Sequence, residues 1–137
     1  MPGARFPTAA QRPRIMLVED DPAVRRSLQM LLHSRGYDVR AHASGATLLA
    51  DPASQGASCL IADYRLSIGY DGVALLQTLR QRGWSAPAIL ITGHSSPDIA
   101  AQALAAGFYS VIDKPLRQGV LASLVARLIE AETPASV

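Results

Sequence analysis

The chain has few of the features that mark secreted, zinc-binding or membrane proteins. Its one cysteine, Cys59, cannot form an internal disulfide and does not supply a cysteine-rich zinc site. No apolar run approaches the roughly 18 residues that a membrane-spanning helix needs. The first 14 residues also lack the apolar centre of a secretory signal. These absences predict a cytoplasmic protein without a membrane partner.

The charge of the chain is small and unevenly placed. There are 13 basic and 11 acidic residues, a formal net charge of +2. Three arginines and no acid fall in the first 14 residues, so the remainder has 10 basic and 11 acidic residues and a net charge of −1. This nearly neutral remainder of the chain gives no electrostatic reason to expect direct nucleic-acid binding. The basic end, rich in proline and alanine, is more simply interpreted as a solvated leader.

Length and hydrophobicity indicate one folded domain. At 137 residues and 49% hydrophobic side chains, the chain can bury one core and has no room for a second. We expect a flexible N-terminal tail at residues 1–13, a single domain at 14–132 and a C-terminal tail at 133–137.

Short apolar or alternating runs alternate with stretches of helical periodicity. The runs typical of strands are residues 14–18, 37–41, 58–62, 87–92 and 108–112. The helical stretches between and after them are residues 22–35, 44–50, 72–82, 96–107 and 116–130. This βα alternation predicts an α/β fold: a doubly wound, five-stranded parallel sheet with helices on both faces.

Polar residues lie at the ends of four of the five predicted strands. Glu19 and Asp20 follow the first strand, Asp63 the third and Lys114 the fifth, and Thr92 is the last residue of the fourth. Ligands of open α/β sheets bind at the carboxyl ends of the strands. Converging carboxylates need raised pKa values or a cation, and hard oxygen ligands with open water positions suit Mg²⁺. An aspartate there could act as a nucleophile toward a phosphoryl group, with a lysine and a hydroxyl to hold its oxygens.

Each of these polar residues also has a purely structural interpretation. An acidic cluster after a strand can simply cap a helix, which accounts for Asp21 but does not explain Glu19 and Asp20. Lys-Pro can be a turn, and Thr92 a loop hydroxyl. A flavin or nucleotide site on the same fold would need a loop rich in glycine and hydroxyls after the first strand. The acidic residues found there would repel a phosphate unless a metal intervened.

Taken together, these motifs resemble the receiver domain of two-component response regulators. The motifs are LVEDDP, LIADYRL, ILITGH and DKP, with DG at 71–72, and the likeness runs from about residue 14 to residue 132. ITGH and the alanine-rich helix after it most resemble nitrogen-fixation-type regulators. The resemblance implies the chemotaxis-regulator fold, with flavodoxin-like strand order 2-1-3-4-5.

The resemblance also implies a role for each acidic residue. Asp63 would accept a phosphoryl group from a histidine kinase or a histidine phosphotransfer protein, in a Mg²⁺-dependent reaction. Asp20 would ligate Mg²⁺ directly and Glu19 through water, and the backbone carbonyl of Arg65 would supply a further ligand. The protein would then be no enzyme beyond its own phosphorylation and dephosphorylation.

By the same resemblance, Thr92 is the switch hydroxyl and Lys114 contacts the phosphoryl group. Phosphorylation would shift the fourth helix, fifth strand and fifth helix between two packings. That face would bind an unidentified target protein or a second copy, and Val120 and Ile129 lie at the edge of its apolar stripe. The leading hypothesis is a stand-alone interaction switch. A phosphate shuttle or sink in a relay and a pseudo-receiver scaffold are the alternatives.

Three features depart from the family pattern. The family's switch aromatic is replaced by Val111, for which Tyr109 is a candidate substitute. The loop at residues 67–70 makes the segment before Gly72 one residue longer than usual. Arg65 and His94 stand where the family flanks the path of the hydrolytic water, and we expect them to slow loss of the phosphoryl group.

Overall fold

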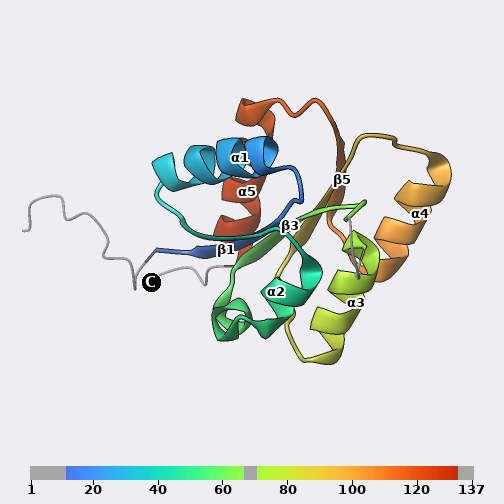
Figure 1. The fold of residues 1–137 in the computed structure, drawn as a ribbon, viewed down its shortest axis with the longest axis horizontal. Helices are drawn as coiled ribbons and strands as arrows, with labels where there is room; N and C mark the ends of the chain where they lie inside the picture. Colours follow the sequence, from blue (N-terminus) through green and yellow to red (C-terminus); the bar gives the residue numbers. More distant parts are fainter. Residues whose placement is uncertain (1–11, 67–70, 133–137) are drawn as a thin grey trace, which may run out of the picture.

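The sheet confirms the predicted fold class. The computed structural model describes residues 12–66 and 71–132. Residues 1–11 of the predicted N-terminal tail at 1–13, the predicted C-terminal tail at 133–137 and the long loop at 67–70 therefore lie outside the described residues. Five parallel strands pair in the order β2-β1-β3-β4-β5 (Figure 1). Their bounds are β1 Arg14–Val18, β2 Asp38–His42, β3 Cys59–Asp63, β4 Ala88–Thr92 and β5 Ser110–Asp113.

Five α-helices connect and follow the strands. They are α1 Pro22–Ser34, α2 Gly45–Ala50, α3 Gly72–Gln81, α4 Pro97–Ala106 and α5 Gln118–Glu132, with a short 3₁₀ helix, η2, at Pro52–Gly56. Local chemistry sets where the helices begin, because the side chains of Asp21, Ser44, Asp71 and Ser96 accept hydrogen bonds from first-turn backbone N–H groups. None of these helices within the described ranges is long and apolar enough to cross a membrane.

The observed ends of two strands differ from the sequence prediction, because pairing with other segments sets where a strand begins and ends. The second strand lies one residue later than predicted, because Val18 pairs with His42 and Arg14 with Asp38. The last strand begins at Ser110 rather than at residue 108. Phe108 still donates its backbone N–H to Ala103 at the end of α4, so it belongs to the helix end. The helix η2 was not predicted.

Two separate apolar cores cover the two faces of the sheet. One core joins alternate strand residues to α2, α3 and α4, and the other joins the intervening strand residues to α1 and α5. Figure 1 shows α1 and α5 together on one side of the sheet and α2, α3 and α4 on the other. Ile129 lies in the core under α5 rather than at its edge, whereas Val120 is exposed. With both faces covered, the carboxyl edge of the strands is left open.

A close backbone approach fixes how α3 meets β3. A Cβ added to Gly72 would lie 2.5 Å from the backbone oxygen of Asp63 and 2.8 Å from Cδ1 of Leu90. Contacts this short cannot be accommodated without moving the chain. The glycine therefore lets the start of α3 press against the strand end that carries Asp63.

We expect Gly72→Ala to lower the free energy of unfolding by about 1–3 kcal/mol, because the added methyl overpacks this junction. Urea unfolding monitored by circular dichroism measures the change. Gly119→Ala in α5 is the matched control, since nothing lies within 4 Å of its added Cβ, and alanine there should be neutral or slightly stabilising. Equal stability of the two variants would contradict the prediction.

Candidate functional site

Three carboxylates meet at the carboxyl edge of the sheet. Glu19, Asp20 and Asp63 each offer an oxygen, and these atoms all lie within 4.8 Å of one another. The register explains the meeting, because Val18 of β1 pairs with Ala62 of β3 and the acidic residues come next on each chain. Glu19 is 2% exposed and Asp63 is 6% exposed, whereas Asp20 is half-buried. The site predicted from the sequence is thus a compact and largely buried acidic cluster.

One ammonium group joins two of these carboxylates. Lys114 Nζ donates to Glu19 Oε1 at 2.8 Å and to Asp63 Oδ2 at 2.6 Å. The lysine follows β5 directly, and its backbone N–H donates to the carbonyl of Thr92 at the end of β4. Main-chain pairing between the last two strands therefore places the ammonium over the acidic cluster.

Burial and proximity shift the ionisation of this cluster. Burial, together with the neighbouring Asp63, raises the pKa of Glu19 to about 7, against the lowering effect of its hydrogen bond to Lys114. Burial by itself lowers the pKa of Lys114, but its hydrogen bonds to Asp63 and Glu19 outweigh this and raise that pKa above its ordinary value. The ammonium is therefore charged at neutral pH, while Glu19 lies close to its titration point.

Thr92, Arg65 and His94 surround the cluster in different ways. Thr92 is buried, and its hydroxyl oxygen accepts the backbone N–H of His94 at 3.2 Å. The backbone N–H of Arg65 donates to Asp63 Oδ1 at 3.2 Å, which engages the second oxygen of that carboxylate. The side chains of Arg65 and His94 are exposed. The structure thus gathers all the predicted residues around one strand edge, while the ligand role of the Arg65 carbonyl stays a prediction.

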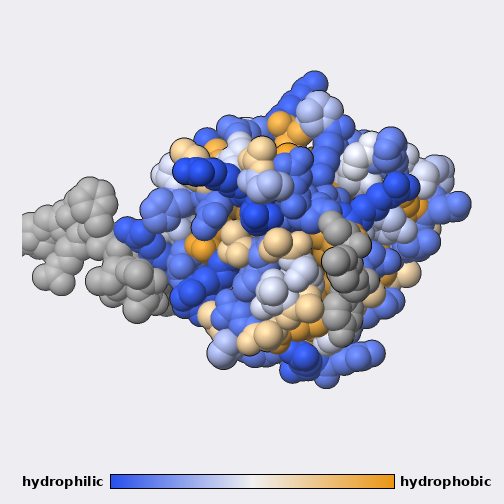
Figure 2. Space-filling model, in the orientation of Figure 1, coloured by the Kyte–Doolittle hydropathy of each residue, from blue (hydrophilic) through white to orange (hydrophobic). Residues whose placement is uncertain are grey.

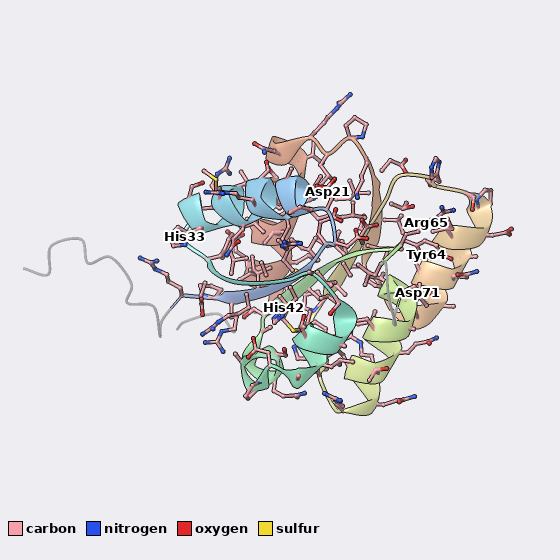
Figure 3. The ribbon with its side chains drawn as sticks, viewed as in Figure 1. Asp21, His33, His42, Tyr64, Arg65 and Asp71 are labelled. Atoms are coloured by element: carbon pink, nitrogen blue, oxygen red, sulfur yellow. The ribbon has the colours of Figure 1, made fainter. Side chains whose placement is uncertain are left out.

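A residue that sequence reasoning did not single out also contacts this site. Arg25 Nη1 of α1 donates to the backbone carbonyls of Glu19 at 2.8 Å and Asp20 at 3.4 Å. The only signal in the sequence is an arginine one turn into the helix that follows the acidic residues. Figure 3 shows Asp21, Tyr64 and Arg65 toward this edge, with His33 at the opposite end of α1. His33 is therefore no part of the site.

The donor set fits a hard divalent cation. It consists of oxygens alone, and one ammonium offsets two buried carboxylates, with Asp20 beside them. The excess of carboxylates over ammonium groups also helps to raise the pKa of Glu19, because negative charge is concentrated where little water reaches it. A few carboxylates with room for water are the ligands that Mg²⁺ prefers.

The sequence is similar to known proteins over nearly all of the described chain. Residues 15–126 match the family described as "Response regulator receiver domain". The C4-dicarboxylate transport transcriptional regulatory protein DctR of Rhodobacter capsulatus is 35% identical over 119 residues, which are 85% of this chain and 60% of that protein. The transcriptional regulatory protein FixJ of Azorhizobium caulinodans is 32% identical over 111 residues, 81% of this chain and 52% of that protein.

The fold is also similar to that of a solved receiver domain. The CheY-like response regulator receiver domain protein of Methanospirillum hungatei JF-1 is 25% identical, with a TM-score of 0.81, over 88% of this chain and 95% of that one. This likeness extends over almost the whole of that solved chain. By contrast, the present chain spans only about half of the two curated regulators named above.

The raised pKa of Glu19 leads to a pH-dependent stability. The native state keeps a proton on this carboxyl between pH 4.5 and about 7 that the unfolded chain releases. The free energy of unfolding, relative to Glu19→Gln, should therefore fall by about 3 kcal/mol as the pH rises through this window. Urea unfolding at several pH values, in chelator to keep divalent cations away, measures the difference.

Glu130→Gln is the control for this measurement, because Glu130 is exposed on α5. Its stability should follow the wild-type pH curve. A difference between wild type and Glu19→Gln that stays constant, or that grows with pH, would show that burial does not hold the proton on Glu19.

Proposed function

The chain belongs to the response regulator receiver domain family, and from this premise we propose that it is a phosphorylation switch whose acceptor is Asp63. The observation that carries the proposal is the Lys114 ammonium 2.6 Å from the Asp63 carboxylate, beside two further carboxylates. A buried nucleophile next to a fixed cation is the arrangement that phosphoryl transfer needs, because that reaction depends mainly on positioning and charge.

The proposed transfer takes the phosphoryl group from a phosphorylated histidine of a partner. An Asp63 oxygen forms a bond to phosphorus while the bond from phosphorus to the histidine nitrogen breaks, and the histidine keeps the electron pair. The Lys114 ammonium, which already donates to Asp63 Oδ2, can then donate to a negatively charged oxygen of the phosphoryl group. Glu19, Asp20 and Asp63, with the Arg65 carbonyl, would hold Mg²⁺, which would supply positive charge to the phosphoryl oxygens.

A groove beside the site offers a surface for the donor. It has a volume of about 630 Å³ and lies between the start of α1 and the segment from Lys114 to Gln118. Ala23, Val24 and Leu28 line one side, and Pro115 and Leu116 line the other. Helix α1 carries arginines and no acid in its sequence. We propose that a histidine kinase or a phosphotransfer protein docks here through an apolar surface flanked by acidic side chains.

The output face is proposed to be α4, β5 and α5. Among the described residues, four large apolar side chains are strongly exposed: Met30 of α1 at 64%, and Leu104, Tyr109 and Val120 at 64%, 60% and 54%. The last three belong to these elements or to the residue just before β5. Tyr109 is thus open to solvent, while Val111 is partly buried against the core. A target protein or a second copy would cover this apolar surface when it binds.

The surface over α2 and α3, which lies beside α4, differs in this respect. Figure 2 shows a mostly hydrophilic face, with apolar colour gathered over α2 and toward α3. None of the large apolar side chains that are strongly exposed comes from α2 or α3. This contrast supports α4, β5 and α5 as the binding face.

The proposal is limited to the switch itself. The chain covers 60% or less of the transcriptional regulators that it resembles, so their role in transcription is not transferred to it. We propose a cytoplasmic protein that catalyses only its own phosphorylation and dephosphorylation. The retained acidic cluster and Lys114 favour this over the scaffold alternative.

Intact mass after incubation with phosphoramidate tests the proposal. With Mg²⁺ present, the wild-type chain should gain one phosphoryl group, and Asp63→Asn should gain none, because an amide cannot replace the carboxylate nucleophile. Without Mg²⁺ the gain should be largely lost. Asp38→Asn is the control, since Asp38 begins β2 at the opposite end of the sheet. An adduct that survives in Asp63→Asn would exclude Asp63 as the acceptor.

Arg65 and His94 should govern how long the phosphoryl group persists. Both side chains are exposed beside the site, where they can obstruct a water molecule approaching in line with the scissile bond. We expect Arg65→Ala and His94→Ala each to speed dephosphorylation several-fold, measured as loss of the adduct mass with time. Arg82→Ala, an exposed arginine at the end of α3, should leave the rate unchanged. Unchanged rates in both test variants would end this idea.

A further inference from the structure

Arg25 folds back from α1 toward the acidic cluster. Its Nη1 donates to the backbone carbonyl of Glu19 at 2.8 Å and, more weakly, to that of Asp20 at 3.4 Å. The side chain is partly buried. The backbone of Arg25 is held at the same time, because its N–H donates to the carbonyl of Asp21 at 2.9 Å in the first turn of the helix. A single guanidinium thus joins a rigid helix to two consecutive residues of the site.

The segment that Arg25 holds lies just beyond the end of a strand. β1 ends at Val18, and the pairing with β2 extends one further bond, from the N–H of Glu19 to the carbonyl of His42 at 3.0 Å. The carboxylate of Glu19 also accepts the N–H of Asp21 at 3.2 Å. These two bonds fix the backbone N–H and the carboxylate of Glu19, and Arg25 fixes its backbone carbonyl.

We propose that Arg25 is a positioning residue for the Mg²⁺ and phosphoryl site. By binding the two carbonyls, it sets the backbone direction from which Glu19 and Asp20 extend toward Asp63. The two hydrogen bonds of its guanidinium that carry this role go to backbone carbonyl oxygens. This inference rests on the proposed function and adds to it a residue that does not touch the reacting atoms.

Geometry and charge make opposite predictions for the loss of Arg25. If the arginine acted only through its positive charge, removing that charge would strengthen Mg²⁺ binding, because like charges repel. If it fixes the backbone, its loss would weaken Mg²⁺ binding by roughly tenfold or more, as is typical when a group that orients metal ligands is removed. The direction of the change therefore separates the two roles.

The test is calorimetric titration of the full chain with Mg²⁺. We expect Arg25→Met to bind Mg²⁺ roughly tenfold more weakly than wild type, and Arg25→Lys to recover part of the loss, because an ammonium can still donate to the carbonyl of Glu19. Arg26→Met is the matched control. Arg26 is the next residue on the helix and is exposed, so its loss should not weaken binding.

Urea unfolding in chelator gives a second readout and checks that each variant is folded. If Arg25→Met does not fold, Arg25→Gln replaces it, since its short amide cannot span to both carbonyls. Unchanged or tighter Mg²⁺ binding in the folded variant would overturn the role of Arg25. Failure of wild type to bind Mg²⁺ and to form the Asp63 adduct would instead overturn the proposed function, so the two failures are distinct.

Discussion

The contact of Lys114 with Glu19 and Asp63 is the interaction on which the rest of the site depends. The ammonium bridges residues 95 and 51 positions away in the chain. Two nearly buried carboxylates would be costly to hold together without a cation, because burial removes the water that would solvate them. The lysine offsets this cost and joins the ends of β1, β3 and β5. Stability and the phosphoryl transfer that we propose therefore depend on the same three side chains.

The fold around this contact keeps one edge of the sheet open and firmly held. Helices cover both faces of the sheet and leave the carboxyl ends of the strands as the place where polar groups can gather. Gly72 allows α3 to approach the strand that carries Asp63. On the other side, Arg25 connects α1 to the backbone of Glu19 and Asp20. The chemical groups are thus fixed by elements packed on both faces.

Much of this arrangement was predictable, and the misses have identifiable causes. The helix starts at residues 22 and 72 were predicted correctly because capping is a local hydrogen bond. The second strand was misplaced by one residue because its ends depend on pairing with β1. Ile129 was placed at a helix edge, but packing of α5 on the sheet buries it. Arg25 was missed because nothing local distinguishes it from its neighbour Arg26.

The sequence by itself determined the alternation of strands and helices, the strand-end positions of Asp63 and Lys114, and the family. Those features follow from local periodicity, from breakers and caps, and from motifs that are contiguous in the chain. Only the tertiary structure decided which oxygens the ammonium binds, that Glu19 is buried with a raised pKa, and that Arg25 reaches back to two carbonyls. These features depend on distances and on exclusion of water between segments far apart in the chain, which arise only when the sheet and its two helical layers pack together.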